Sequence, residues 1–264
     1  MTISDITHIL IDTSYFIFYR YYALINWWKC ARPDDPLGNP IENQEFVEKF
    51  KKTFNDKLFE IPKKLKIKNY KIIAAKDCPR LNIWRHKLFN KYKVNRVYDD
   101  EFLGGPFFEL GFQILSTLNI PIIKHPNLEG DDCIALTVQS LKREKQQDIV
   151  IIANDMDYLQ LAAPNIKLMN LKYKLLTDSK KWSGNPEQDL FCKIVMGDKS
   201  DDIPSVFKKC GPKTAIKYYE NRKLFREQLE RENAQEQYER NKKIIDFNEI
   251  PEDIALEFMV NLTI

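Results

Sequence analysis

The amino-acid sequence predicts an α/β protein with a mostly parallel central sheet that is flanked by helices. Five apolar runs rich in β-branched residues recur along the chain, and helical patterns lie between them. Alternating strands and helices are typical of parallel sheets, because each return to the same sheet edge needs a crossover connection. The length of 264 residues is sufficient for one such domain with a small appended region.

The five apolar runs are the expected strands. In chain order they are His8–Asp12, Tyr70–Asp77, Ile120–His125, Asp148–Asp155 and Ile166–Leu171. A helix is expected over Leu128–Lys145, with acidic residues in its first turn and basic residues in its last. From about Asn185 the pattern is wholly helical, and Arg222–Lys243 is interpreted as a solvated helix with a thin apolar stripe. We therefore divide the chain into an α/β domain, residues 1–184, and a helical region, residues 185–264.

The composition excludes a membrane protein and a secreted disulfide scaffold. The longest apolar runs, such as Ile149–Ala153, are far shorter than the roughly 20 residues of a membrane span, and the N-terminus lacks a basic-then-apolar signal. The five cysteines are scattered without a C-x-x-C pair, which argues against disulfides and zinc. A cytosolic or nuclear compartment is expected.

The charge is unevenly distributed although the net charge is only +3. Nine carboxylates fall in the short motifs described below. Without them, 41 basic residues face 29 acidic ones, a net of about +12. A basic body around an acidic site is the pattern that a metal-using enzyme with a phosphate-rich substrate needs.

Acidic residues follow four of the expected strands. Three strands end at Asp12, Asp77 and Asp155, and the fourth is followed by an acidic loop that contains Glu129, Asp131 and Asp132. A single aspartate after a strand is ordinarily a turn residue or a helix N-cap. Four such sites are harder to explain in that way, since the carboxyl ends of parallel strands meet at one edge, where ligands bind.

Gathering these carboxylates implies a metal site. Two charges about 4 Å apart repel by roughly 4 kcal/mol at an effective dielectric of 20, and protonation or bound cations relieve this repulsion. Asp157 adds to the set, because it shares a strand face with Asp155 if that strand continues. Oxygen ligands favour Mg²⁺ or Mn²⁺, and two such ions support phosphoryl transfer. At this point a metal-dependent phosphatase fits as well as a nuclease.

Two later segments resemble the signature of the 5′ nuclease family. Met196–Val206, MGDKSDDIPSV, and Cys210–Ala215, CGPKTA, are similar to the family pattern G-D-x-S-D-N-I-P-G-V followed by G-I-G-P-K-T-A. The family comprises flap endonucleases and 5′–3′ exonucleases, with a PIN-like domain and a helix-hairpin-helix. The match is specific because the acidic half and the glycine-hairpin half occur in order.

Upstream segments extend the resemblance over roughly Ile9 to Tyr219. A weaker sequence similarity near Tyr238 is to viral and phage members of the family, which work as free-standing nucleases. The matching segments are Ile9–Ser14, Leu128–Ala135, Ile152–Leu161, and Asp77 with Trp84–His86 and Tyr92–Arg96, which resembles the start of the family's helical arch. We place this arch at about residues 78–110.

The resemblance implies roles for individual residues. The metal ligands would be Asp12, Asp77, Glu129, Asp131 and Asp132 for one ion, and Asp155, Asp157, Asp198 and Asp201 for the other. Lys93 and Arg96 would reach from the arch and neutralise the scissile phosphate. The DNA-binding residues would be Arg80, Arg85, Lys208, Lys209, Gly211, Lys213 and Thr214. An aromatic after Asp12 stacks a terminal base in the family, and the sequence leaves open which of Tyr15, Phe16, Phe18 and Tyr19 does so.

Departures from the family pattern qualify these implications. Asp202 stands where asparagine is usual, which adds a negative charge beside the late ligands. Ser205 replaces a glycine, and Phe207–Cys210 is one residue longer than the usual segment and lacks its glycine. A K⁺ ion bound by hairpin carbonyls, known in relatives, is therefore in question, and the two lysines of this segment are the alternative phosphate ligands.

The resemblance implies a monomeric, Mg²⁺-dependent nuclease, in which Mn²⁺ substitutes and which acts on DNA at 5′ ends, flaps or nicks, with RNA/DNA hybrids as a further substrate. Replication, repair and recombination use such an activity. Two alternatives are a PIN-type ribonuclease, which lacks the glycine hairpin, and a catalytically silent junction-binding protein, which would have lost ligands. The sequence does not separate exonuclease from flap endonuclease, since substrates are distinguished by shape and deformability.

Overall fold

The sheet of the protein has five strands, all parallel, in the order β3-β2-β1-β4-β5. The computed structural model describes residues 6–96, 102–144 and 147–264. The strands are β1 (Thr7–Asp12), β2 (Tyr70–Ala75), β3 (Ile122–Ile123), β4 (Ile149–Ile152) and β5 (Ile166–Met169). All five expected strands are confirmed. Four of them are shorter than expected, and Asp77 and Asp155 lie in the loops that follow β2 and β4, whereas β1 includes Asp12 as its last residue.

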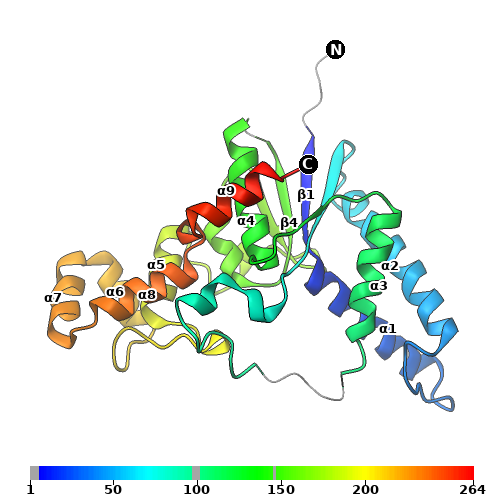
Figure 1. Cartoon of the computed structure of the whole chain (residues 1–264), viewed down its shortest axis with the longest axis horizontal. Helices are drawn as coiled ribbons and strands as arrows, with labels where there is room; N and C mark the ends of the chain where they lie inside the picture. Colours follow the sequence, from blue (N-terminus) through cyan, green and yellow to red (C-terminus); the bar gives the residue numbers. More distant parts are fainter. Residues whose placement is uncertain (1–5, 97–101, 145–146) are drawn as a thin grey trace.

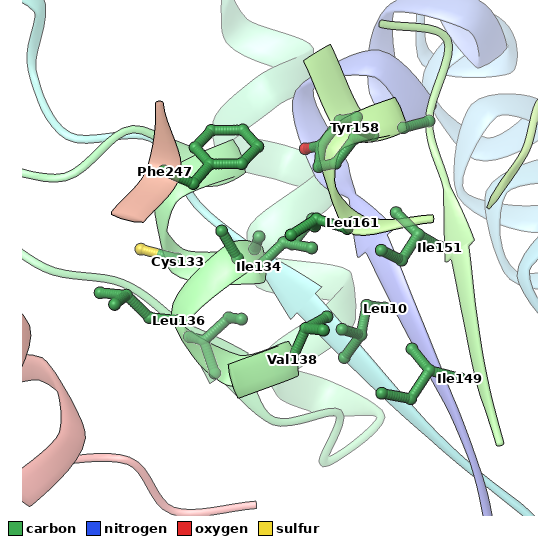
Figure 2. Packing of buried hydrophobic residues seen from close by; sticks show 14 of the residues in the cluster. Leu10, Cys133, Ile134, Leu136, Val138, Ile149, Ile151, Tyr158, Leu161 and Phe247 are labelled. Carbon is green, nitrogen blue, oxygen red and sulfur yellow. The ribbon is translucent and has the colours of Figure 1, made fainter. Parts of the chain in front are cut away.

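Side chains of successive strand residues point to opposite faces of the sheet, and helices cover both faces (Figure 1). Ile9 and Ile11 pack against α1 (Thr13–Ala31), α2 (Gln44–Lys64) and α3 (Gly105–Thr117). Leu10 points the other way, toward α4 (Gly130–Glu144) and α9 (Glu252–Val260). Figure 2 shows this second face, where Leu10, Ile149 and Ile151 meet side chains of α4. The apolar clusters on the two faces of the sheet fix the position of the sheet edge at which the strands end.

The helical part forms a separate apolar cluster beside the sheet. Its helices are α5 (Pro186–Met196), α6 (Pro212–Glu220), α7 (Arg222–Glu232) and α8 (Gln235–Ile245). Figure 1 shows α6 and α7 at one end of the molecule and α1 and α2 at the other. The segment Arg222–Lys243, expected as a solvated helix with an apolar stripe, is divided between two helices, because Asn233 has a positive φ of 48° and ends α7. The expected stripe is confirmed, since Phe225 and Leu229 are buried in the same cluster as Phe191.

The last helix, α9, packs with α4 on one face of the sheet and not with the helical cluster. Phe247, Ile250, Ile254 and Phe258 lie in the same buried cluster as Leu10. Figure 1 shows α9 lying close to α4. The helical cluster therefore comprises residues 186–245, a shorter range than the expected helical region 185–264.

Short 3₁₀ helices complete the chain, at Arg80–Asn82, Trp84–Lys87, Met156–Leu161, Leu176–Asp178, Lys199–Asp201 and Phe247–Glu249. In the described part of residues 78–110, a regular α-helix starts only at Gly105. The crest of the expected arch, residues 97–101, lies outside the described residues. Within the described ranges, no helix is long and apolar enough to span a membrane.

Candidate active site

The carboxyl ends of the strands and two loops meet at a cavity of about 760 Å³. Asp12 is the last residue of β1, Asp77 follows β2, and Asp155 follows β4. Most of the expected site residues line this cavity: Asp12, Asp77, Glu129, Asp131, Asp155, Asp157, Asp198, Arg80, Lys93 and Arg96. Asp201 lies beside it, because both Lys93 and Arg96 pair with its carboxylate.

Asp12 joins the sheet to the site. Its carboxylate accepts hydrogen bonds from the Tyr15 backbone N–H, at 3.0 Å, and from the Tyr158 hydroxyl, at 3.3 Å. It is thus the N-cap of α1 as well as a wall of the cavity. Burial, and next the charge of Asp77, raise the pKa of Asp12 to about 7. The cavity therefore opposes full ionisation of its carboxylates unless a cation enters.

Asp77 is fixed from two sides. One carboxylate oxygen accepts a hydrogen bond from the Gly130 N–H at 2.7 Å, and the other accepts one from the Ser14 hydroxyl. A Cβ on Gly130 would lie 3.0 Å from Asp77 Oδ1, so the glycine allows this close approach. Ser14 was not among the expected site residues. Its position two residues after the acidic strand end at Asp12 is the signal that could have identified it.

Three acidic residues meet at the start of α4, where Glu129 precedes the helix and Asp131 and Asp132 lie in its first turn. Ligand oxygens of Glu129, Asp131 and Asp132 lie within 4.8 Å of one another. Burial, and next the charges of Asp132 and Glu129, raise the pKa of Asp131 well above its usual value. Glu129 differs, because Lys93 lies 2.5 Å and Arg85 lies 2.9 Å from its carboxylate. These cations lower the pKa of Glu129, although its burial acts in the opposite direction.

Asp132 and Arg85 form a buried pair behind the cavity. Arg85 donates to both carboxylate oxygens of Asp132, at 2.6 and 2.7 Å, and its Nε donates to the Ile244 carbonyl at 2.7 Å. Asp132 also accepts hydrogen bonds from the Trp84 indole and the Glu129 N–H. Arg85 is 2% exposed and Asp132 is 0% exposed. The expectation of DNA contact by Arg85 does not fit this burial, because its side chain is held inside the protein. Asp132 offers a ligand oxygen within 4.8 Å of those of Glu129 and Asp131, so its expected role as a metal ligand stays a prediction.

A second acidic cluster comprises Asp157, Asp198 and Asp201, with ligand oxygens again within 4.8 Å. The expectation that Asp155 and Asp157 share a continuing strand is wrong, because β4 ends at Ile152. Asp155 instead caps the following 3₁₀ helix by accepting a hydrogen bond from the Asp157 N–H at 2.9 Å. This turn directs both carboxylates toward the cavity.

The loop after α5 positions the late pair of acids. Gly197 has a positive φ of 70°, and a Cβ there would lie 2.4 Å from the Ile203 carbonyl oxygen. Only glycine fits this turn. Asp198 then caps the Lys199–Asp201 turn by accepting a hydrogen bond from the Ser200 N–H at 2.8 Å. The presence of glycine in the G-D-K-S-D motif thus has a steric explanation, the tight turn at Gly197, which the motif alone does not reveal.

Lys193 is a site residue that the sequence did not reveal. Its ammonium lies 2.9 Å from Asp198 Oδ2 and also pairs with Asp157. Burial acts to raise the pKa of Asp198, but Lys193 and the Ser200 hydrogen bonds outweigh it and lower this pKa to about 2. Lys193 lies within α5 with no motif around it. Only the packing of α5 against the loop at Met156–Leu161 brings it to the cavity.

Lys93 and Arg96 enter the cavity from the segment after the Trp84–Lys87 turn. Lys93 is 8% exposed, and its ammonium lies between Glu129 and Asp201, at 2.5 and 3.8 Å. Arg96 pairs with Asp201 at 2.5 Å. Arg80 holds this segment, because its guanidinium donates to the carbonyls of Lys93, Val94 and Arg96. The two cations therefore lie at the junction of the two acidic clusters.

Asp202, the departure from the family pattern, turns away from the acidic clusters. It has a left-handed backbone with φ of 59°, which explains why a short polar residue is suited to this position. Its carboxylate accepts hydrogen bonds from the Asn95 N–H and side-chain amide, at 2.8 and 2.7 Å. Asp202 thus fixes the segment that carries Lys93 and Arg96.

The expected DNA-binding residues of the hairpin lie outside the cavity. Lys208, Lys209 and Lys213 are exposed, and Gly211 precedes Pro212 at the start of α6, with Thr214 in its first turn. Lys209 has a left-handed φ of 57° in the segment that lacks the family's glycine. This face presents positive charge and a helix N-terminus to the solvent.

The donor chemistry of the cavity fits divalent metal ions. The two acidic clusters offer carboxylate oxygens, the ligands that hard cations prefer. Cys78 also lines the cavity, but burial, and next the charge of Glu129, raise the pKa of its thiol to about 12. The carboxylates far outnumber this single thiol, and hard divalent ions such as Mg²⁺ prefer oxygen to sulfur ligands.

Comparison with known proteins agrees with this geometry. Residues 7–187 match the family model described as the 5′-3′ exonuclease N-terminal resolvase-like domain. The chain is 31% identical to a 5′-3′ exonuclease of Buchnera aphidicola from Acyrthosiphon pisum, over 79% of this chain and 68% of the relative. It is 30% identical to the protein named ribonuclease H of phage T4, over 73% of this chain and 70% of the relative. The fold is similar to the T5 D15 protein crystallised with metal ions, with a TM-score of 0.67, 15% identity and 97% coverage of both chains.

Proposed function

The chain belongs to the 5′-3′ exonuclease family and is a nuclease that depends on divalent metal ions, and we propose that it hydrolyses DNA phosphodiesters near 5′ ends, flaps and nicks with two Mg²⁺ ions. The observation that carries this proposal is the meeting of seven carboxylates with Lys93 and Arg96 in one cavity. RNA primers paired with DNA are a further proposed substrate, in keeping with the name of the phage T4 relative.

The proposed ligands divide into two sets. Asp12, Asp77, Glu129 and Asp131 would hold one ion, and Asp155, Asp157, Asp198 and Asp201 would hold the other. When bound, two such ions lower the pKa of a coordinated water and stabilise the leaving oxygen of an in-line displacement. Asp132 is proposed to support the site from outside the cavity, because its ion pair with Arg85 holds the arginine that orients Glu129.

Lys93 and Arg96 are proposed to stabilise the charge that builds up on the scissile phosphate. In the absence of substrate they offset the charges of Glu129 and Asp201. Bound cations would take over that role and free the two side chains for phosphoryl oxygens. Positive groups already in place need little reorganisation as charge develops, which is why they accelerate such reactions.

The hairpin lysines are proposed to bind the duplex backbone away from the scissile bond. Lys208, Lys209 and Lys213 are exposed around the N-terminus of α6, where phosphates bind favourably. We propose that Lys208 and Lys209 neutralise a phosphate of the duplex backbone, the role that a K⁺ ion bound to the hairpin would otherwise have. The two other functions considered are not favoured: the glycine hairpin argues against a PIN-type ribonuclease, and the full set of carboxylates argues against a silent binding protein.

Metal-dependent cleavage tests the proposed function. With 5′-labelled flap, nicked and RNA-primed duplexes, we expect cleavage in Mg²⁺ or Mn²⁺, none in EDTA, and recovery when Mg²⁺ is restored. Gel analysis of product lengths would distinguish release of mononucleotides from release of the whole flap. Full activity in EDTA, or cleavage of single-stranded RNA in preference to every DNA substrate, would contradict the proposal.

Lys213 and the pair Lys93 and Arg96 are expected to separate binding from turnover. Lys213→Ala should weaken DNA binding and reduce the slope of log affinity against log salt by about one, because one phosphate contact is lost. Lys93→Ala or Arg96→Ala should reduce turnover at saturating substrate by roughly 10²-fold, with a smaller loss of affinity. Single-turnover kinetics and salt titrations measure the two effects. The reverse pattern would contradict the proposed placement of Lys93 and Arg96 at the scissile phosphate and of Lys213 on the duplex.

A further inference from the structure

A run of lysines occupies the turn between α2 and β2. Residues 61–76 include six lysines and no acidic residue. Leu65 and Ile67 of this turn pack against the apolar cluster on the α1, α2 and α3 face of the sheet, whereas the lysines between and around them are exposed. We call the four exposed ones the lysine patch: Lys63, Lys64, Lys66 and Lys68.

The lysine patch forms no ion pair within residues 6–96, 102–144 and 147–264. Glu60 is the acidic residue nearest to it in the sequence, and the Glu60 carboxylate pairs with the Lys57 ammonium at 2.6 Å. Like charges that lie close together repel one another. A surface of one sign therefore attracts a partner of the opposite sign.

Helix stability accounts for only part of this charge. Lys63 and Lys64 lie in the last turn of α2, where cations interact favourably with the helix dipole. This interaction is confined to the last turn of a helix, so it does not explain Lys66 and Lys68, which follow the helix.

Lys66 occupies a backbone position that favours glycine. Its φ is 57°, and its N–H donates to the Lys63 carbonyl at 3.1 Å. The next N–H, that of Ile67, donates to the Pro62 carbonyl at 2.9 Å. These two bonds form a Schellman motif, whose left-handed residue is usually glycine because a Cβ is strained there. Folding alone would favour glycine at this position, so the lysine calls for an explanation outside the fold.

The lysine patch lies at the end of the sheet opposite to the catalytic cavity. Tyr70 begins β2 and pairs with Thr7 at the start of β1, whereas the cavity lies at the carboxyl ends of these strands. In Figure 1, β1 enters the sheet from the top of the view, and α6 and α7 lie at the left. A duplex that contacts the hairpin and the cavity lies at the carboxyl ends of the strands. The patch therefore suits a ligand other than the substrate.

Two exposed apolar side chains lie at the same end of the sheet. Tyr70 is 37% exposed and Ile6 is 41% exposed. Ile6 directly precedes Thr7, the residue that pairs with Tyr70. The backbone of DNA presents phosphates without apolar groups, whereas an acidic peptide presents carboxylates and apolar side chains together. The combination of lysines with these two side chains favours a peptide.

We propose that the lysine patch, together with Tyr70 and Ile6, binds an acidic segment of a partner protein. The segment would carry aspartates or glutamates and at least one apolar side chain. Such a contact would tether the protein to its partner and leave the cavity and the hairpin free for DNA.

Fluorescence anisotropy of a labelled peptide tests the proposal. The probe is a short, aspartate-rich peptide that contains leucine, and its counterpart has asparagine in place of every aspartate. Wild-type protein should bind the acidic probe, with an affinity that falls as salt is added, and should not bind the counterpart. Lys66→Glu combined with Lys68→Glu should lower the affinity for the probe by about tenfold or more, because two attractions become repulsions.

Lys172→Glu combined with Lys174→Glu is the matched control. These two lysines are also exposed and separated by one residue, but they follow β5 at its carboxyl end. The control changes the net charge by the same amount and should keep the affinity within about twofold of the wild type.

Lys66→Gly distinguishes loss of charge from loss of fold. Glycine suits the left-handed position, so the melting temperature should be unchanged or higher, while the affinity for the acidic probe should fall.

Three outcomes would overturn the proposal. They are no binding of the acidic probe by the wild type, an equal loss of affinity in the control pair, and a loss of affinity for flap DNA in Lys66→Glu with Lys68→Glu, which would make the patch a DNA contact. Cleavage by that variant should match the wild type. Failure of the nuclease function would be a separate result, the absence of metal-dependent cleavage by the wild-type protein.

Discussion

Replacing Asp155 and Asp157 together with asparagine is expected to lower the rate of DNA cleavage by about 10³-fold or more. Both carboxylates line the cavity, and we propose both as ligands of one metal ion. Loss of that ion removes several kcal/mol of stabilisation of the attacking and leaving oxygens, and each 1.4 kcal/mol is a factor of about ten in rate. Single-turnover cleavage of a labelled flap substrate measures the effect.

DNA binding by the same double variant should survive in Ca²⁺, because exposed lysines around α6 supply phosphate contacts far from the two aspartates. Asp148→Asn is the matched control, since Asp148 precedes the first residue of β4 at the end opposite to Asp155. Its cleavage rate should stay close to that of the wild type. A double variant that cuts at the wild-type rate would show that these carboxylates only shape the loop.

Replacing Arg85 with methionine is expected to destabilise the protein by about 3–5 kcal/mol. The change leaves Asp132, which is 0% exposed, without its bidentate partner, and it also removes the hydrogen bond to the Ile244 carbonyl. An uncompensated buried charge is the main cost. Urea unfolding at neutral pH, followed by circular dichroism, measures the difference in the free energy of unfolding.

Two further variants isolate the pair. Arg143→Met changes an exposed arginine on α4 and should alter the free energy of unfolding by less than about 0.5 kcal/mol. Arg85→Met combined with Asp132→Leu removes both charges and should recover part of the lost stability. If Arg85→Met alone were as stable as the wild type, the pair would have no structural role.

The fold was largely predictable because its signal is local. Apolar strand runs such as Ile149–Ile152 alternate with helical patterns, and each of the five strands coincides with an expected run to within one residue or lies inside it. What the sequence missed depends on packing between distant residues. The helix break at Asn233 depends on a left-handed backbone conformation, which asparagine permits but does not require. The helix α9 returns to the sheet because Phe247 and Phe258 pack on the face of the sheet that carries Leu10.

The acidic residues of the site were predictable from their positions at strand ends, and the cavity does bring most of them together. Their partners were not predictable. Lys193 reaches the cavity through the docking of α5, and Arg85 is turned inward by Asp132, which lies 47 residues further along the chain. A motif identifies the residues that a reaction needs, but not the neighbours that set their charge and orientation.

The hydrogen bond from Arg85 to the Ile244 carbonyl has a consequence for synthesis of the protein. Chains grow from the N-terminus, so Asp132 and Glu129 leave the ribosome more than a hundred residues before Ile244. Until that later segment folds back, the arginine that orients Glu129 lacks one of its anchors, and α9 does not yet cover α4. A nascent chain would therefore hold Glu129 and Asp132 in an imperfect arrangement until the segment around Ile244 has been made and has folded back.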